Sequence, residues 1–223
     1  MRVKSTWHKG SVKTIEDIAG ALAFNSWRIT KNHLEDLINE AFVVEKAQVF
    51  DVIKEYLCYL IQCVDRLAYA QLDTEKRQQL IILLAKQLAA YYQENKEERI
   101  GMDDHYQAFI DLYNQRAQDY NQYDFVGGEP SYHFLRYFAE KVQKAMTEAD
   151  EKWIVQQMVE IQAPKAFNSI SKSVDELLSV KEIISKEEKL KRRANKVPRS
   201  KRASTRQEVL YQNQSSSDNI TKS

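Results

Sequence analysis

The sequence predicts an all-α protein, and three of its features agree on this. Five Gly and three Pro among 223 residues are few for a strand-rich fold, which needs both for tight turns. Ala, Leu, Gln, Glu and Lys, which favour helices, are abundant. Apolar residues recur at helical spacing over most of the sequence. We therefore expect a single bundle-like domain of about six or seven helices with short connections.

The first helix is expected to follow a polar, flexible segment, residues 1–13. Thr14 starts it, and Asp17 three residues later completes a capping box for free backbone N–H groups. The apolar face then shifts near Asn32, which offers a second start signal. Residues 14–43 are therefore predicted to form either two helices or one kinked helix.

The second predicted helix has the clearest pattern and is expected to be central. Its inner stripe follows offsets 0, 3, 4, 7, 8, 11, 15 and 18 along the chain: Val49, Val52, Ile53, Tyr56, Leu57, Leu60, Val64 and Leu67. Phe50 and Ile61 widen its apolar arc. The chain's two cysteines, Cys58 and Cys63, lie too far apart on this helix for a disulfide, so reduced thiols in the core are expected.

Two further helices follow, each with a capping signal. Asp73 caps the first, and Gly101 ends it through a left-handed conformation. The second begins near Asp103 or Asp104 and carries a tyrosine every seven residues: Tyr106, Tyr113 and Tyr120. These rings either line a protein-interaction groove, where Tyr is enriched, or fill the bundle interior. The core-helix spacing favours the interior.

The only strong loop signal in the body is the sequence VGGEP, residues 126–130. Ser131 or a neighbour restarts the chain, and Thr147 caps a short helix that Pro164 ends. The inner face of this short helix is predicted to hold Trp153, Ile154 and Met158. Residues 14–163 would then make up the helical domain.

The region after the domain, residues 164–185, is predicted to be a linker with a possible amphipathic helix. The apolar side of that helix would hold Val174, Leu177, Leu178 and Ile184. Because the stripes of the body end at Met158, we expect the domain to fold without the chain beyond about residue 166.

A basic tail completes the sequence and divides its charge unevenly. Residues 186–206 contain ten Lys or Arg and two acidic residues, a net charge of +8, so the rest carries −7 of the total +1. Residues 186–223 have too little apolar surface to offset ordering entropy, so we expect the tail to be largely disordered. The cations expected to contact an anionic partner are Lys189, Lys191, Arg192, Arg193, Lys196, Arg199, Lys201 and Arg202.

This tail has three interpretations. It neutralises nucleic-acid phosphates, or it lies on an anionic membrane with residues 173–185 as an apolar anchor, or it only keeps the protein solvated. Residues 186–206 lack aromatic side chains that would stack on bases, which argues against single-strand recognition.

Motifs for catalysis or cofactor binding are absent from the sequence. The histidines His8, His33, His105 and His133 form no HExxH or ExxH pattern, and no CxxC, GxSxG, GxGxxG or P-loop occurs. We therefore expect no metal, no cofactor and no catalytic residues. No apolar run is long enough to span a membrane and no secretory signal is present, so a cytoplasmic protein is expected.

These features favour a non-enzymatic helical adaptor or accessory module, whose body binds another protein and whose tail provides electrostatic attachment. The alternative is a nucleic-acid-associated accessory protein that binds through the tail. An enzyme without a recognisable motif is the third hypothesis.

Leu60 lies in the middle of the most apolar stripe, so it tests the predicted buried face. Leu60→Ala should lower the free energy of unfolding by about 2–5 kcal/mol, the usual effect of a cavity in a packed core. A urea titration followed by circular dichroism measures this loss. A change within experimental error would place the buried face elsewhere.

Overall fold

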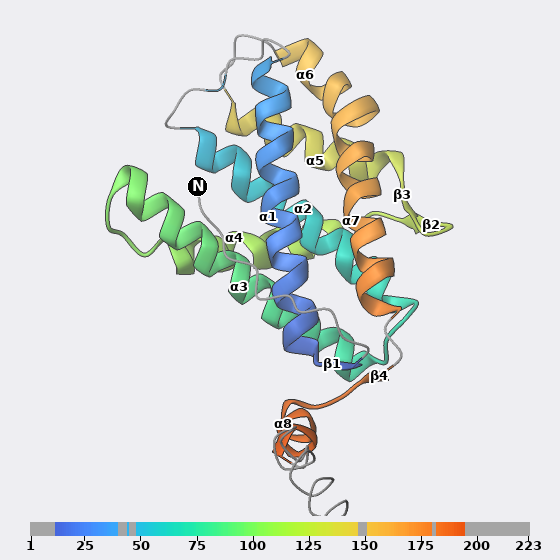
Figure 1. Ribbon diagram of the computed structural model, residues 1–223. Helices are drawn as coiled ribbons and strands as arrows, with labels where there is room; N and C mark the ends of the chain where they lie inside the picture. The colour runs from blue at the N-terminus through green and yellow to red at the C-terminus, as the bar shows by residue number, and fades with distance from the viewer. Residues whose placement is uncertain (1–11, 40–43, 45–47, 147–150, 180–181, 195–223) are drawn as a thin grey trace, which may run out of the picture. The chain divides into compact units, whose positions relative to one another are not determined.

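Helices dominate the computed structural model, which confirms the predicted fold class. It describes residues 12–39, 44, 48–146, 151–179 and 182–194. The chain divides into two units, Met1–Ile183 and Ile184–Ser223. The helices of the first unit are α1 (Ile15–Asn39), α2 (Val49–Tyr69), α3 (Thr74–Ile100), α4 (His105–Tyr120), α5 (Tyr132–Ala145), α6 (Glu151–Gln157) and α7 (Ala163–Leu178) (Figure 1).

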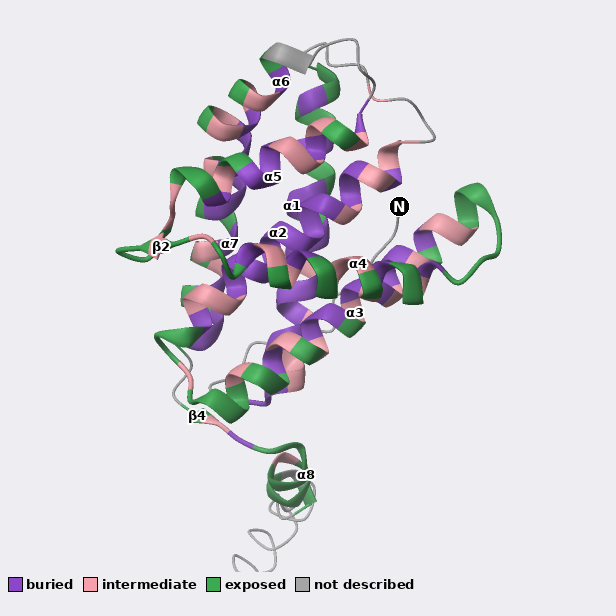
Figure 2. Cartoon of the chain, turned by 180° about the vertical axis from the view of Figure 1, so that it is seen from behind, coloured by how far each residue is buried: buried purple, intermediate pink, exposed green. Residues whose placement is uncertain are grey.

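Helix α2 lies at the centre of the bundle, as its sequence predicts. It contacts α1, α3, α4, α5 and α7, so it has neighbours on nearly every side. Leu60 and most of the other residues of its predicted stripe are buried. Figure 2 shows α2 coloured as buried over much of its length. Both cysteines of this helix are also buried and unpaired, as expected. The wide apolar arc is therefore explained by contact with several helices at once.

Helix α1 is one continuous helix, so of the two predicted alternatives the single helix is correct and a second start at Asn32 does not occur. Its N-terminus has the expected capping box: the Thr14 N–H donates to Asp17 Oδ2 at 2.9 Å and the Asp17 N–H to Thr14 Oγ1 at 3.2 Å. The helix packs against α2, α3 and α7. Because these neighbours cover different faces, the apolar stripe changes face without a break in the helix.

Helices α3 and α4 form a hairpin whose capping residues were predicted. Asp73 accepts a hydrogen bond from the Lys76 N–H, and Asp104 accepts one from the Gln107 N–H. Gly101 follows α3 with φ 121° and ψ 173°, a positive φ that favours glycine but is not the left-handed helical conformation. The end of this hairpin projects beyond the neighbouring helices (Figure 1).

The predicted loop at residues 126–130 is a small hairpin of β2 (Phe125–Val126) and β3 (Glu129–Pro130). Gly127 and Gly128 have φ values of 63° and 86°, the positive values that a tight two-residue turn requires. Ser131 then caps α5, as expected, by accepting a hydrogen bond from the Phe134 N–H.

The region around Pro164 differs from the prediction, because the helix does not end there. A π-helical segment, Met158–Gln162, joins α6 to α7 without interruption. The Ala163 N–H donates to the Met158 carbonyl five residues earlier, the wider spacing of a π-helix. Pro164 thus lies directly after the π-helical segment, where the irregular hydrogen-bond spacing accommodates a residue without an N–H.

The predicted inner face of α6 is partly wrong. Ile154 and Met158 are buried, whereas the Trp153 side chain is 72% exposed. The predicted cap at Thr147 lies outside the described residues.

Helix α7 belongs to the core, so the prediction of a linker at residues 164–185 is wrong. Its buried residues join the same hydrophobic cluster as α1 and α2: Ala163, Ala166, Phe167, Ile170, Val174, Leu177 and Leu178. The amphipathic character was predicted, but its apolar side faces the bundle and is not available as a membrane anchor. Beyond it, β4 (Glu182–Ile183) pairs in parallel with β1 (Val12–Lys13).

The second unit contains α8 (Lys186–Ala194), so this part of the predicted disordered tail is helical. The Ser185 hydroxyl accepts a hydrogen bond from the Glu188 N–H, which caps the helix. Glu188 also pairs with Arg192 at 2.6 Å, four residues later. Acidic residues in the first turn and cations beyond it suit the helix dipole. The prediction for residues 195–223 lies outside the described residues.

Truncation after residue 166 and after residue 185 distinguishes the predicted end of the helical core from the observed one. A chain ending at residue 166 loses five buried apolar residues of α7, each worth about 1.5–3 kcal/mol, which is comparable with the whole stability of a domain. We expect it to lose cooperative unfolding. A chain ending at residue 185 keeps all of α7 and should melt like the full chain. Thermal melts followed by circular dichroism test both; equal melting of the shorter chain would contradict the assignment of α7 to the core.

Candidate functional site

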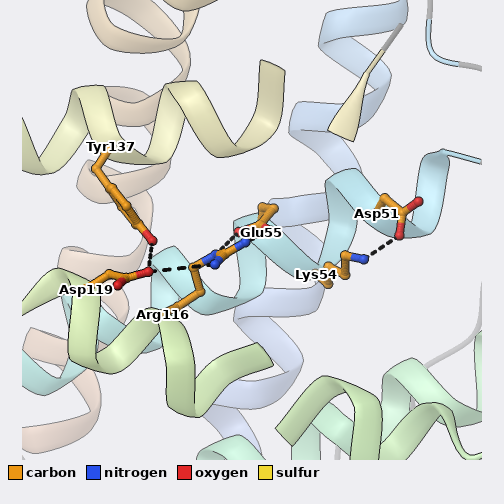
Figure 3. Close-up of polar contacts among 6 residues, drawn as sticks. All are labelled: Asp51, Lys54, Glu55, Arg116, Asp119 and Tyr137. Carbon is orange, nitrogen blue, oxygen red and sulfur yellow. Dashed lines mark hydrogen bonds and ion pairs between the residues drawn. The ribbon is translucent and has the colours of Figure 1, made fainter. Parts of the chain in front are cut away.

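The most distinctive polar feature of the body is a buried ion pair between α2 and α4 (Figure 3). Arg116 Nε donates to Glu55 Oε2 at 2.8 Å, and Arg116 Nη2 donates to Glu55 Oε1 at 2.7 Å. Glu55 is 5% exposed and Arg116 is 9% exposed. The planar guanidinium and the carboxylate thus form a bidentate pair, the strongest geometry for these two groups.

A second carboxylate extends this pair towards α5. Asp119 Oδ2 lies 3.8 Å from Arg116 Nη1 and accepts a hydrogen bond from the Tyr137 hydroxyl (Figure 3). Burial, together with the hydrogen bond to Asp119, raises the pKa of Tyr137. The four side chains therefore connect α2, α4 and α5 through one polar network.

The charged side chains of this network form ion pairs with one another. Hydrogen bonds to Glu55 raise the pKa of Arg116 above its already high ordinary value, so the guanidinium remains charged at neutral pH. Both Glu55 oxygens accept hydrogen bonds from Arg116. Charge-assisted hydrogen bonds of this kind hold the two groups in one relative orientation. The network thus positions α2 and α4 relative to each other.

The thiols of α2 are poor candidates for nucleophilic chemistry. Burial raises the pKa of Cys58, and the nearby Glu55 charge raises it further. Burial also raises the pKa of Cys63. The thiolate is the reactive form of cysteine, so neither group is activated at neutral pH.

The described histidines lie on three different helices and do not form a cluster. His33, which the sequence places among polar residues, is buried and pairs through Nδ1 with Gln162 Oε1 at 2.6 Å. His105 is buried at the start of α4, where Nε2 lies 3.0 Å from the Gly101 carbonyl oxygen. His133 is exposed, and His8 lies outside the described residues. Within the described part of the chain, no three His, Cys, Asp or Glu residues are grouped to hold a metal ion.

The predicted tyrosine surface does not form as a unit. Tyr120 is 1% exposed, and its ring packs 4.5 Å from that of Phe134, so it belongs to the core. Tyr106 and Tyr113 are half-buried against the same core. Burial raises the pKa of Tyr113, with a smaller contribution from Asp65. The interior placement, which the spacing favoured, is correct for Tyr120.

The predicted anion-binding residues lie in the second unit. Lys189, Lys191, Arg192 and Arg193 are on α8, and both Lys191 and Arg192 are exposed. The other predicted cations lie outside the described residues: Lys196, Arg199, Lys201 and Arg202. The structure thus places the first four together on one short helix.

The Glu55–Arg116 pair was not predicted, although the sequence contains a signal for it. Glu55 lies next to Tyr56 within the wide apolar arc of α2. Arg116 follows Tyr113 by three residues and therefore shares its face of α4. Opposite charges on the inner faces of two neighbouring helices suggest a buried pair. Choosing between this pair and other combinations still requires the three-dimensional packing.

Comparisons with protein-family models, curated proteins and solved structures find no match to this chain. In the part of the chain that the structure describes, no helix combines the length and apolar character needed to cross a membrane.

The buried pair should be sensitive to loss of one partner. Glu55→Gln or Arg116→Gln should each lower the free energy of unfolding by about 3–5 kcal/mol, because one buried charge is left without compensation. The double variant, Glu55→Gln with Arg116→Gln, should cost less than the sum of the two single changes. Urea titrations of the four chains measure the coupling. The exposed pair of Arg136 and Glu140 is the control, since Arg136→Gln should have a much smaller effect. Additive effects at Glu55 and Arg116 would contradict the coupling.

Proposed function

We propose that this chain is a non-enzymatic, cytoplasmic interaction protein, with a helical body that binds another protein and a basic segment, residues 186–206, that attaches to an anionic surface. The observation that carries this proposal is the concentration of positive charge in residues 186–206. The basic segment has a net charge of +8, whereas the rest of the chain has −7. It begins in a unit separate from the bundle core.

Helix α8 supports the attachment role because it concentrates cations on a short exposed element. Lys191 and Arg192 project from it to solvent, and Leu190 is its exposed apolar residue. Cations within a few turns of one another raise the local attraction for an anionic partner and speed association. The burial of Val174 and Leu177 in the core removes the apolar anchor on which the membrane interpretation depended.

The body offers apolar side chains for a protein partner at the end of the α3–α4 hairpin. Ile100 is exposed at the end of α3, and Met102 just beyond Gly101 is 92% exposed. The side chain of methionine adapts to the shape of a partner, which suits a binding surface. Meanwhile, the buried thiols and the paired Glu55 carboxylate support a structural role for the reactive groups of the bundle.

Charge neutralisation tests the attachment role. We expect that a variant with five tail cations replaced by Gln, at Lys191, Arg192, Arg193, Lys201 and Arg202, loses most of its binding to a polyglutamate peptide. Binding of the unmodified chain should fall steeply with salt, because each ion pair formed releases counterions or is screened. Fluorescence anisotropy over a salt series measures both effects, with duplex DNA and RNA as parallel ligands.

A matched variant replaces five cations of the body by Gln, at Lys31, Lys76, Lys86, Arg99 and Lys165. It removes the same charge and should retain tail-dependent binding. If the tail variant binds as tightly as the unmodified chain, the segment is not an attachment site. Binding to nucleic acid with no measurable affinity for polyglutamate would instead favour the nucleic-acid accessory function.

A further inference from the structure

A cavity of about 330 Å³ opens beside the Glu55–Arg116 pair, between α2, α4 and α5. Its size is at the small end of the range for ligand pockets, which suits a small molecule better than a peptide. Charged side chains make up most of its lining among the residues that the structure describes: Gln48, Asp51, Lys54, Glu55, Arg116, Lys141, Lys144 and Ala145.

Positive charge exceeds negative charge among these lining residues. Four cations face two carboxylates, which leaves a net charge of +2. Lys54 pairs with Asp51 at 2.5 Å, and Arg116 pairs with Glu55 (Figure 3). The excess therefore lies with the two lysines of α5, Lys141 and Lys144. Asp119 also pairs with Arg116, and when it is counted with these lining residues their net charge is still +1.

Lys141 is held in this cavity by its surroundings. Its ammonium nitrogen lies 4.7 Å from the centroid of the Tyr137 ring, so a cation–π contact fixes its direction. Burial lowers the pKa of Lys141, and the charges of Arg116 and then Lys144 lower it further; Asp119 and Glu55 act in the opposite sense but do not reverse the shift. An anion in the cavity would supply the compensation that these carboxylates do not.

The kinds of donor indicate the kind of anion. A carboxylate ligand is recognised best by the planar fork of an arginine, but Glu55 already occupies the fork of Arg116. The remaining donors are the ammonium groups of Lys54, Lys141 and Lys144, and ammonium groups act as point charges that suit phosphate oxygens. A phosphate monoester carries about −1.5 to −2 charges at neutral pH, close to the excess of the lining.

We propose that this cavity binds the phosphate group of a small anion, either free phosphate or a small phosphate monoester, through Lys54, Lys141 and Lys144. Arg116 contributes its positive field while it remains paired with Glu55. The site lies within the body and is independent of the basic segment, so it is a binding activity additional to the proposed function.

The test is a nuclear magnetic resonance titration of the full chain at constant ionic strength. Inorganic phosphate and glycerol phosphate are the two ligands, and glycerol is the uncharged control. Backbone amide shifts should move around Lys54 on α2 and around Lys141 on α5 with either phosphate ligand, and should not move with glycerol. Tighter binding of the ester would identify a phosphorylated small molecule as the ligand, and equal binding would identify free phosphate.

Two variants separate this site from general attraction of anions. Lys141→Gln with Lys144→Gln should weaken binding by about tenfold or more, which corresponds to about 1.4 kcal/mol or more. Lys86→Gln with Lys165→Gln removes the same charge from exposed positions elsewhere and should leave the affinity nearly unchanged. Thermal melts check that all chains remain folded. Equal affinity of the Lys141/Lys144 variant, or shifts confined to residues 186–206, would overturn the proposal.

Discussion

The enclosure of α2 is the constraint on which the rest of the bundle depends. Five other helices contact it, so each of them has its apolar stripe directed by one central element. A charged side chain on a helix that is buried on most sides loses its hydration, yet Glu55 is one of the buried residues of α2. Leaving that carboxylate unpaired would cost several kcal/mol, which explains why Arg116 on α4 pairs with both of its oxygens. The requirement to pair one charge therefore fixes the rotation of α4 against α2.

The same central helix stabilises the irregular segment before Pro164. The Tyr59 hydroxyl donates to the Ala163 carbonyl at 3.0 Å, and the Tyr56 hydroxyl lies 3.5 Å from Met158 Sδ. Both tyrosines come from α2; Tyr56 reaches the first residue of the π-helical segment, and Tyr59 reaches the first residue of α7 directly after it. Side chains from the core therefore stabilise a turn whose hydrogen-bond spacing is irregular, and α7 continues into the bundle where its sequence suggested a boundary.

Sequence patterns within one or two helical turns predicted the capping residues and the apolar stripes. They failed for features that depend on which helices pack against one another. Thr14, Asp73 and Ser131 cap helices as expected, because a cap depends on residues within one turn. The continuity of α1 depends on three packing partners, and the exposure of Trp153 depends on which face of α6 meets the core. The polar network was missed for the same reason: each charge is visible in its own helix, but the distance between them arises only from packing.

The pairing of β1 with β4 gives the bundle a nearly circular topology. Val12 pairs with Glu182 and Lys13 with Ile183, so the point where the chain enters the helical body adjoins the point where it leaves. Because the strands are parallel, a connection from the end of β4 to the start of β1 must run back along the two-residue ladder as well as across the gap of about 5 Å between neighbouring strands. The spatial arrangement of the helices is therefore separable from the order in which they are linked: joining these ends and opening the chain at the Gly127–Gly128 turn would describe the same packing with a different first residue.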